Sequence, residues 1–116
     1  MNEKRKEFLD FLNDRKVAVL AEVKALAEEG RTDDSNILKA KANIYDIAKA
    51  FFETVTKAAS EGAEKEAFLK AFGRVTGQWE ATYEQAKAHD DSRQVLIEEA
   101  KFQAVAEIKD KLAELF

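Results

Sequence analysis

The sequence has no cysteine and no proline, and it contains only four glycines and one histidine. Without cysteine, the chain forms no disulfide scaffold, no cysteine-ligated zinc site and no thiol nucleophile. The single histidine, His89, offers no second imidazole ligand, and the Glu-x-x-His pattern of di-iron bundles is absent. We interpret His89 as a residue at a helix end, where a cation is favourable. We therefore expect no metal ion and no cofactor.

A net positive charge and long apolar runs are also absent. The formal net charge is -4, whereas nucleic-acid-binding domains normally present a basic surface. The longest uncharged apolar run is Val17–Ala21, far shorter than the roughly 20 residues of a membrane span. Lys4, Arg5 and Lys6 are not followed by the apolar region of a signal peptide. We expect a cytoplasmic protein that binds neither nucleic acid nor membrane.

Helical periodicity runs through nearly the whole chain. Hydrophobic residues make up 46% of the sequence, which is ordinary for a chain that buries a core. Because proline is absent, helices must stop at clusters of Gly, Asp, Asn and Ser. Three such clusters, at 30–35, 60–62 and 89–92, divide the chain into four segments. The predicted helices span about 2–29, 35–60, 63–88 and 92–115.

Each segment repeats apolar residues at spacings near three and four, as an amphipathic helix does. Short connections between helices of similar length favour antiparallel neighbours. The sequence thus predicts one all-α domain over residues 1–116, an antiparallel up-down-up-down four-helix bundle. We expect Gly30 and Gly62 to close helices in the left-handed conformation. Asp34 or Ser35 is expected to cap the second helix, and Asp91 the fourth.

The two halves of the chain resemble each other weakly. Asp-Asp-Ser precedes a predicted helix at 33–35 and again at 90–92. Phe8 corresponds to Phe68 at an offset of 60 residues, and Ile37 corresponds to Val95 at an offset of 58. A duplicated helical hairpin would explain both matches. Because any two amphipathic helices match in part, duplication is a hypothesis only.

The fourth segment carries two apolar stripes, although a monomeric bundle needs only one core-facing stripe. The first stripe comprises Val95, Phe102, Ala106 and Ala113. The second comprises Ile97, Ala104, Ile108 and Leu115. We interpret the second stripe as a candidate face for a partner protein or a second copy of the chain, with contributions from Phe11 and Val17. The alternative is a helix buried on two sides within its own bundle.

Two charged residues fall inside predicted apolar arcs. Lys41 lies in the arc of the second segment and Glu98 in that of the fourth, at similar distances from a shared end of the bundle. An unpaired buried charge costs several kcal/mol. We therefore predict that Lys41 and Glu98 form a partly buried ion pair or share a polar network. The alternative is that each side chain reaches water along its own stem.

The 23 carboxylates do not complete a recognisable catalytic pattern. Glu28–Glu29 and Glu98–Glu99 each lack the third glutamate of the Glu-Glu-x-x-Glu motif with which some all-α nucleotide pyrophosphohydrolases bind magnesium. Glu7 and Asp10 have a suitable spacing but lie on a polar helix face. Magnesium catalysis requires carboxylates that converge in a cleft. The sequence therefore does not favour an enzyme.

The function that the sequence favours is a small, non-catalytic helical interaction protein, an adaptor or regulator that binds protein or itself through a helix face. The first alternative is a small-molecule binder that uses an aromatic stripe in the third segment, Phe68, Phe72, Trp79 and Tyr83. The second alternative is a carboxylate-dependent enzyme. The sequence leaves open whether Gly73 and Gly77 break the third helix.

Overall fold

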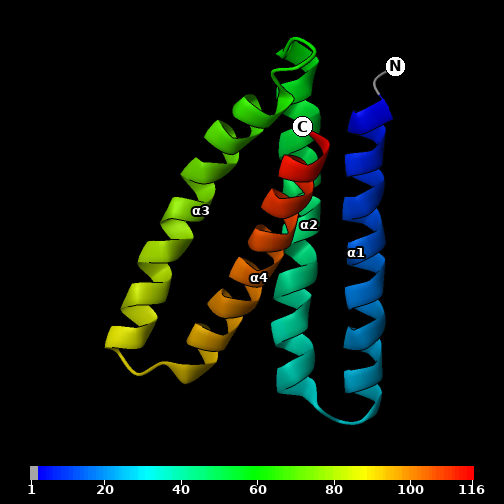
Figure 1. The fold of residues 1–116 in the computed structure, drawn as a ribbon. Helices are drawn as coiled ribbons and strands as arrows, with labels where there is room; N and C mark the ends of the chain where they lie inside the picture. Colours follow the sequence, from blue (N-terminus) through cyan, green and yellow to red (C-terminus); the bar gives the residue numbers. More distant parts are fainter. Residues whose placement is uncertain (1–2) are drawn as a thin grey trace.

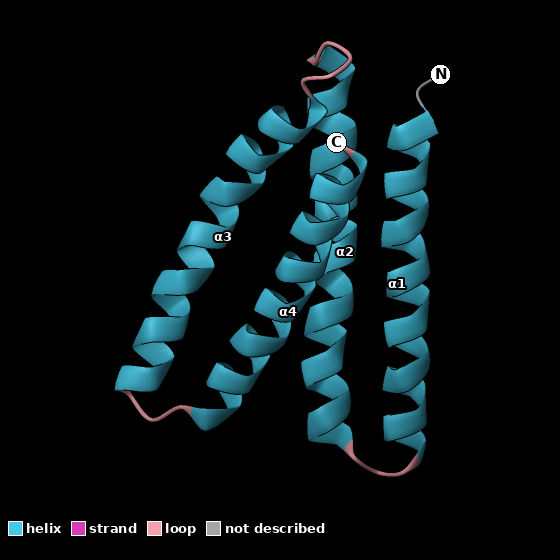
Figure 2. Cartoon of the chain, viewed as in Figure 1, coloured by secondary structure: helices cyan, strands magenta, loops and turns pink. Residues whose placement is uncertain are grey.

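Four helices account for nearly all of the chain in the computed structural model, which describes residues 3–116. They are α1 (Glu3–Glu28), α2 (Thr32–Ala58), α3 (Glu64–Ala88) and α4 (Ser92–Leu115), as Figures 1 and 2 show. Within residues 3–116 there is no strand. The predicted all-α four-helix architecture is confirmed.

The bundle is compressed along one of its diagonals. Successive helices run in opposite directions, with α1 and α3 at the two edges of the view and α2 and α4 between them (Figure 1). No Cα of α1 lies within 8 Å of a Cα of α3, whereas α2 and α4 pack directly on each other. The smallest extent of the molecule is 20 Å, which corresponds to about two helix diameters.

Aromatic rings from three helices meet at the end of the bundle where α1 begins. Phe8 and Phe52 have ring centres 4.6 Å apart, and Phe68 stacks on Phe72 at 4.9 Å. All four side chains are fully buried. Burial of each ring contributes up to about 3 kcal/mol, and favourable ring pairs add about 1 kcal/mol. The rest of the continuous core comprises Leu12, Val19, Ala42, Ile44, Tyr45, Ala48, Ala104, Val105, Ile108 and Leu112.

The helix ends confirm two of the predicted signals and correct a third. Gly30 has a φ of 78° and closes α1 in the left-handed conformation. Gly62 also has a positive φ, 95°, but it does not close α2, which ends at Ala58 with an extended Ala59 as its cap. The Asp91 Oδ1 atom accepts a hydrogen bond from the Gln94 backbone N–H at 3.1 Å. Asp91 therefore caps α4 as expected.

The predicted cap of α2 is wrong. The helix begins at Thr32, so Asp34 and Ser35 lie within its first turn. Asp34 pairs instead with Arg31 at 2.9 Å. Ser35 is buried, and its hydroxyl donates to the Val23 carbonyl oxygen at 3.2 Å. The α2 helix begins closer to Gly30 than the Asp-Asp-Ser pattern predicts. The Ser35 hydroxyl is therefore not needed as a cap and instead joins α2 to α1.

The internal-duplication hypothesis receives mixed support from burial. Phe8 and Phe68, which correspond at an offset of 60 residues, are both fully buried. Ile44 is buried as well, but its counterpart Phe102 is only half-buried. Duplication of a helical hairpin stays a hypothesis.

The two glycines of α3 do not break the helix, which runs without interruption from Glu64 to Ala88. Both glycines are exposed, and a Cβ atom at either position would meet no heavy atom within 4 Å.

We predict that Gly73→Ala and Gly77→Ala each raise the free energy of unfolding by about 0.5–1 kcal/mol, because alanine restricts the unfolded chain and suits a helix interior. Urea denaturation measures the change. Gly62→Ala is the matched control, and it should destabilise the protein by about 1 kcal/mol because its φ is 95°. Destabilisation by Gly77→Ala would show that α3 is not continuous at this position.

Candidate functional site

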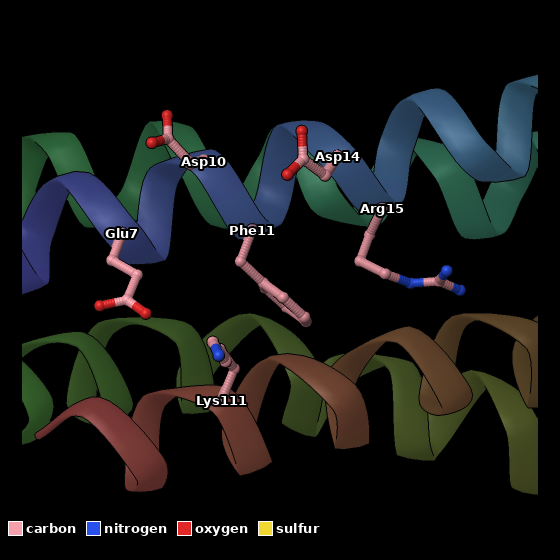
Figure 3. Close-up of a pocket in the computed structure, with 6 residues that line it drawn as sticks. All are labelled: Glu7, Asp10, Phe11, Asp14, Arg15 and Lys111. Carbon is pink, nitrogen blue, oxygen red and sulfur yellow. The ribbon is translucent and has the colours of Figure 1, made fainter.

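A surface groove follows the line along which α1 and α4 face each other. It has a volume of about 270 Å³ and is open to solvent (Figure 3). Its lining residues are Glu7, Asp10, Phe11, Asp14 and Arg15 of α1 and Lys111 of α4. Glu7, Phe11 and Arg15 extend toward α4, whereas Asp10 and Asp14 stand on the outer side of α1 (Figure 3). Spacings of four residues place Glu7, Phe11 and Arg15 along the side of α1 that faces α4.

The charges of the groove are unevenly compensated. Arg15 Nε lies 2.8 Å from Glu107 Oε1, and Lys111 Nζ lies 3.2 Å from Glu114 Oε1. Each basic side chain therefore already has a carboxylate of α4 as its partner. The three acidic side chains of the lining have no ion pair within residues 3–116. The groove consequently presents a surplus of negative charge.

The aromatic ring in the groove already carries a cation. Lys111 Nζ lies 5.7 Å from the centre of the Phe11 ring, within the range of a cation–π interaction. Phe11 is half-buried and also packs against the core. It was predicted as part of a partner face, and the structure places it on the wall of the groove.

A polar network at one end of the groove connects three helices. Glu107 of α4 accepts a hydrogen bond from the Tyr45 hydroxyl at 3.1 Å and lies 3.2 Å from Lys41 Nζ. Arg15 of α1 is its third partner. Burial opposes ionisation of Glu107, but Lys41 and Arg15 hold its pKa below the ordinary value. Burial, followed by the charge of Glu107, raises the pKa of Tyr45 to about 12.

The predicted ion pair between Lys41 and Glu98 is wrong, although both residues are largely buried. Lys41 pairs with Glu107, and the fully buried Glu98 pairs with Lys101 of its own helix. Lys101 Nζ donates to Glu98 Oε1 at 3.1 Å and lies 2.8 Å from Glu98 Oε2. The same nitrogen lies 4.6 Å from the centre of the Trp79 ring. This second ion pair therefore lies where α4 packs on α3.

The predicted partner face on α4 also needs correction. Ala104 and Ile108 are fully buried in the shared core, and Ile97 and Leu115 are half-buried. The structure thus supports the alternative, in which α4 is buried on more than one side. The first stripe, which includes Phe102, is less buried than the second. Its alanines at positions 106 and 113 are exposed, and alanine has little apolar area to bury. Val17, in contrast, is 59% exposed on α1.

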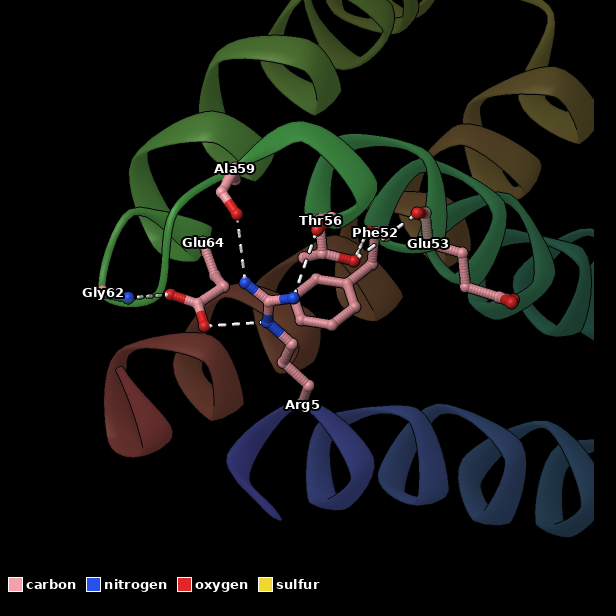
Figure 4. A network of polar contacts seen from close by, with 7 residues as sticks. All are labelled: Arg5, Phe52, Glu53, Thr56, Ala59, Gly62 and Glu64. Atoms are coloured by element: carbon pink, nitrogen blue, oxygen red, sulfur yellow. Dashed lines mark hydrogen bonds and ion pairs between the residues drawn. The ribbon is translucent and has the colours of Figure 1, made fainter. Parts of the chain in front are cut away.

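A further network fixes the start of α1 to the connection between α2 and α3 (Figure 4). Arg5 Nε lies 2.9 Å from Glu64 Oε2, and its two terminal nitrogens donate to the carbonyl oxygens of Thr56 and Ala59 at 3.1 and 3.3 Å. The Gly62 N–H donates to Glu64 Oε1 at 2.6 Å. Sequence reasoning missed this network, although a glutamate at the start of a predicted helix is a usable signal.

Glu64 is 1% exposed, yet its pKa lies below the ordinary value. Burial by itself would raise the pKa of Glu64. The backbone N–H groups of Glu64 and Gly62 and the Arg5 guanidinium lower it by more. The carboxylate therefore stabilises the folded state in its ionised form.

The two alternative functions, a small-molecule binder and a carboxylate-dependent enzyme, have no assembled site within the described residues. Within residues 3–116, no three His, Cys, Asp or Glu side chains are grouped so that they could hold a metal ion. Phe68 and Phe72 of the aromatic stripe are fully buried and stack on each other, and Phe68 also contacts Phe52. None of the helices in this part of the chain has the length and apolar character needed to cross a bilayer.

No model of a known protein family, no curated protein sequence and no solved structure matches the chain. Function is therefore inferred from the surface chemistry of the chain itself.

We predict that Glu64→Gln lowers the free energy of unfolding at neutral pH by about 2 kcal/mol, because Arg5 loses a charged acceptor. Since the pKa of Glu64 is lowered in the folded state, its contribution is present above the unfolded value of 4.5 and is lost as the pH falls through the folded value. Urea denaturation across this range should therefore show the wild type and variant converging in acid. A difference that does not change with pH would contradict this role.

We also predict that Lys101→Met lowers the free energy of unfolding by about 3–5 kcal/mol, because it leaves the buried Glu98 carboxylate without a counter-charge. The double variant Glu98→Leu with Lys101→Met should recover most of this loss, since it removes both charges. Thermal and urea unfolding of the four proteins complete a double-mutant cycle. Additive losses in that cycle would show that the two side chains act independently.

Proposed function

We propose that the protein is a non-catalytic helical interaction protein that binds a basic segment of a partner polypeptide in the groove between α1 and α4. The observation that supports this proposal is a carboxylate beside a partly exposed aromatic ring, with further carboxylates along the groove's outer rim. Glu7 extends into the groove one turn before Phe11, and Asp14 stands at the outer rim about one turn after it; neither has an ion pair within residues 3–116. A cytoplasmic location, which the sequence predicts, is part of the proposal.

The chemistry of the occupant follows from the groove's own contacts. Lys111 already places an ammonium group over the Phe11 ring. A lysine or arginine of the partner pairs with Glu7 or Asp14 and displaces Lys111 from the ring or packs its aliphatic stem beside it. Because these carboxylates repeat over two helical turns, a partner helix with basic residues at spacings of three and four fits them best.

Two features favour this function over the alternatives. The groove volume of about 270 Å³ is below the lower end of typical small-molecule pockets, which is about 300 Å³, and the groove is open. The carboxylate with the most polar contacts in this region, Glu107, is fully engaged by Arg15, Lys41 and Tyr45. A carboxylate held in its ionised form by two cations is a poor general acid or base at neutral pH.

Binding of a synthetic leucine–lysine helical peptide tests the proposal by fluorescence anisotropy. The groove variant Glu7→Lys with Asp14→Lys should raise the dissociation constant at least about tenfold, because it replaces attraction with like-charge repulsion. Phe11→Ala should weaken binding without changing the net charge.

The matched control is Glu53→Lys with Glu80→Lys, which makes the same change in net charge at exposed positions of α2 and α3. This control should change the dissociation constant by less than about threefold, the effect expected of distant, screened charges. Equal losses in the two double variants would show that the peptide responds only to overall charge. No binding by the wild type would also overturn the proposal.

A further inference from the structure

The outer face of α1 carries exposed apolar side chains that the groove does not use. Val17 is 59% exposed and Leu20 is 40% exposed, and with Leu96 they are the large hydrophobic residues exposed within residues 3–116. α1 lies at an edge of the bundle (Figure 1), and its buried residues Phe8, Leu12 and Val19 face inward. Val17 therefore stands on the side of α1 that no other helix of the chain covers.

Four charged residues accompany Val17 on this outer face. Asp10 and Lys24 lie seven residues before and after Val17, and Lys6 and Glu28 lie eleven residues before and after it. Seven and eleven residues are close to two and three helical turns, so all four point within about 20° of Val17. They are exposed, and none has an ion pair within residues 3–116.

The charges on this face are self-complementary about Val17. If a second α1 lies antiparallel on the first with a twofold axis at Val17, Asp10 of one copy meets Lys24 of the other, and Lys6 meets Glu28. The twofold axis generates each of these contacts twice. Opposite charges thus meet at two positions along the helices, seven and eleven residues from Val17, on both sides of the twofold axis.

A shallow depression lies beside Leu20. Apolar side chains of a second copy can pack into it. It has a volume of about 240 Å³ and lies between α1 and α2, lined by Lys16, Leu20, Lys39, Ala42, Asn43 and Asp46. Lys16 and Asp46 are already paired at 3.0 Å. Lys39, the third charged residue of the lining, has no ion pair within residues 3–116.

From this symmetry of charge and apolar exposure, we propose that the protein forms a homodimer in which the outer faces of two α1 helices pack antiparallel about a twofold axis at Val17. The inference goes beyond peptide binding, because Val17 and three of the four charged residues lie outside the groove; only Asp10 also belongs to its lining. A contact made by one helix from each copy is smaller than a standard interface of about 1,600 Å². The dimer is accordingly weak and sensitive to salt.

Sedimentation equilibrium of the full chain, from micromolar to millimolar concentration, tests the proposal. In about 0.01 M salt the average mass should rise from 13.1 kDa toward twice that value, and about 1 M salt should weaken the association. Asp10→Lys should raise the dissociation constant at least about tenfold, because it opposes Lys24 of the other copy. Adding Lys24→Glu to the same chain restores opposite charges and should restore association.

Glu80→Lys on α3 is the matched control for the change in net charge, and it should leave association unchanged. Because the chain has no cysteine, Val17→Cys provides an independent readout. Mild oxidation should link two copies through this residue, whereas Glu80→Cys should link them far more slowly. A chain that stays at 13.1 kDa throughout, or an Asp10→Lys defect that Lys24→Glu does not correct, would overturn the proposal.

Discussion

The fold depends on a cluster of phenylalanine rings at one end of the bundle. Phe8, Phe52, Phe68 and Phe72 come from α1, α2 and α3 and have no solvent exposure. The Arg5–Glu64 pair closes the same end, where it fixes the start of α1 to the connection between α2 and α3. Toward the opposite end, α3 and α4 diverge from α1 and α2 (Figure 1), and the rings of Tyr83 and Phe102, which meet there between α3 and α4, are only half-buried. Stability is thus concentrated at one end of the bundle.

Hydrophobic periodicity was sufficient to predict the four helices, because amphipathic spacing and glycine stop signals are local properties of the chain. It was insufficient to predict the rotation of α4. Two stripes of similar hydrophobicity were available, and the three-dimensional packing buried Ala104 and Ile108 of the stripe that had been interpreted as free. The same rotation explains the wrong ion pair, since Glu98 found a partner one turn away and Lys41 found Glu107. Long-range partners of charged residues depend on such rotations and are not encoded in spacing alone.

The candidate surfaces follow from the unequal packing of α1. Its inner face fills the core, the side toward α4 borders an acidic groove, and its outer face carries Val17 among charged residues that have no ion pair within the described part of the chain. Of the groove, only Phe11 was anticipated from the sequence, because it lies off the main apolar stripe. The groove itself is a product of the compressed bundle, in which α2 and α4 pack closely while α1 meets α4 along only a short contact. The two proposed binding surfaces therefore rest on a helix that the aromatic cluster holds in place.

Amide hydrogen exchange along α3 tests most directly whether the aromatic end holds the bundle together. The amides around Phe68 and Phe72 should exchange close to the rate set by global unfolding, since opening them disrupts the ring cluster. Those around Tyr83, where side chains are largely exposed, should exchange much faster through local opening. Uniform protection along α3, or slower exchange at its Tyr83 end, would contradict this account.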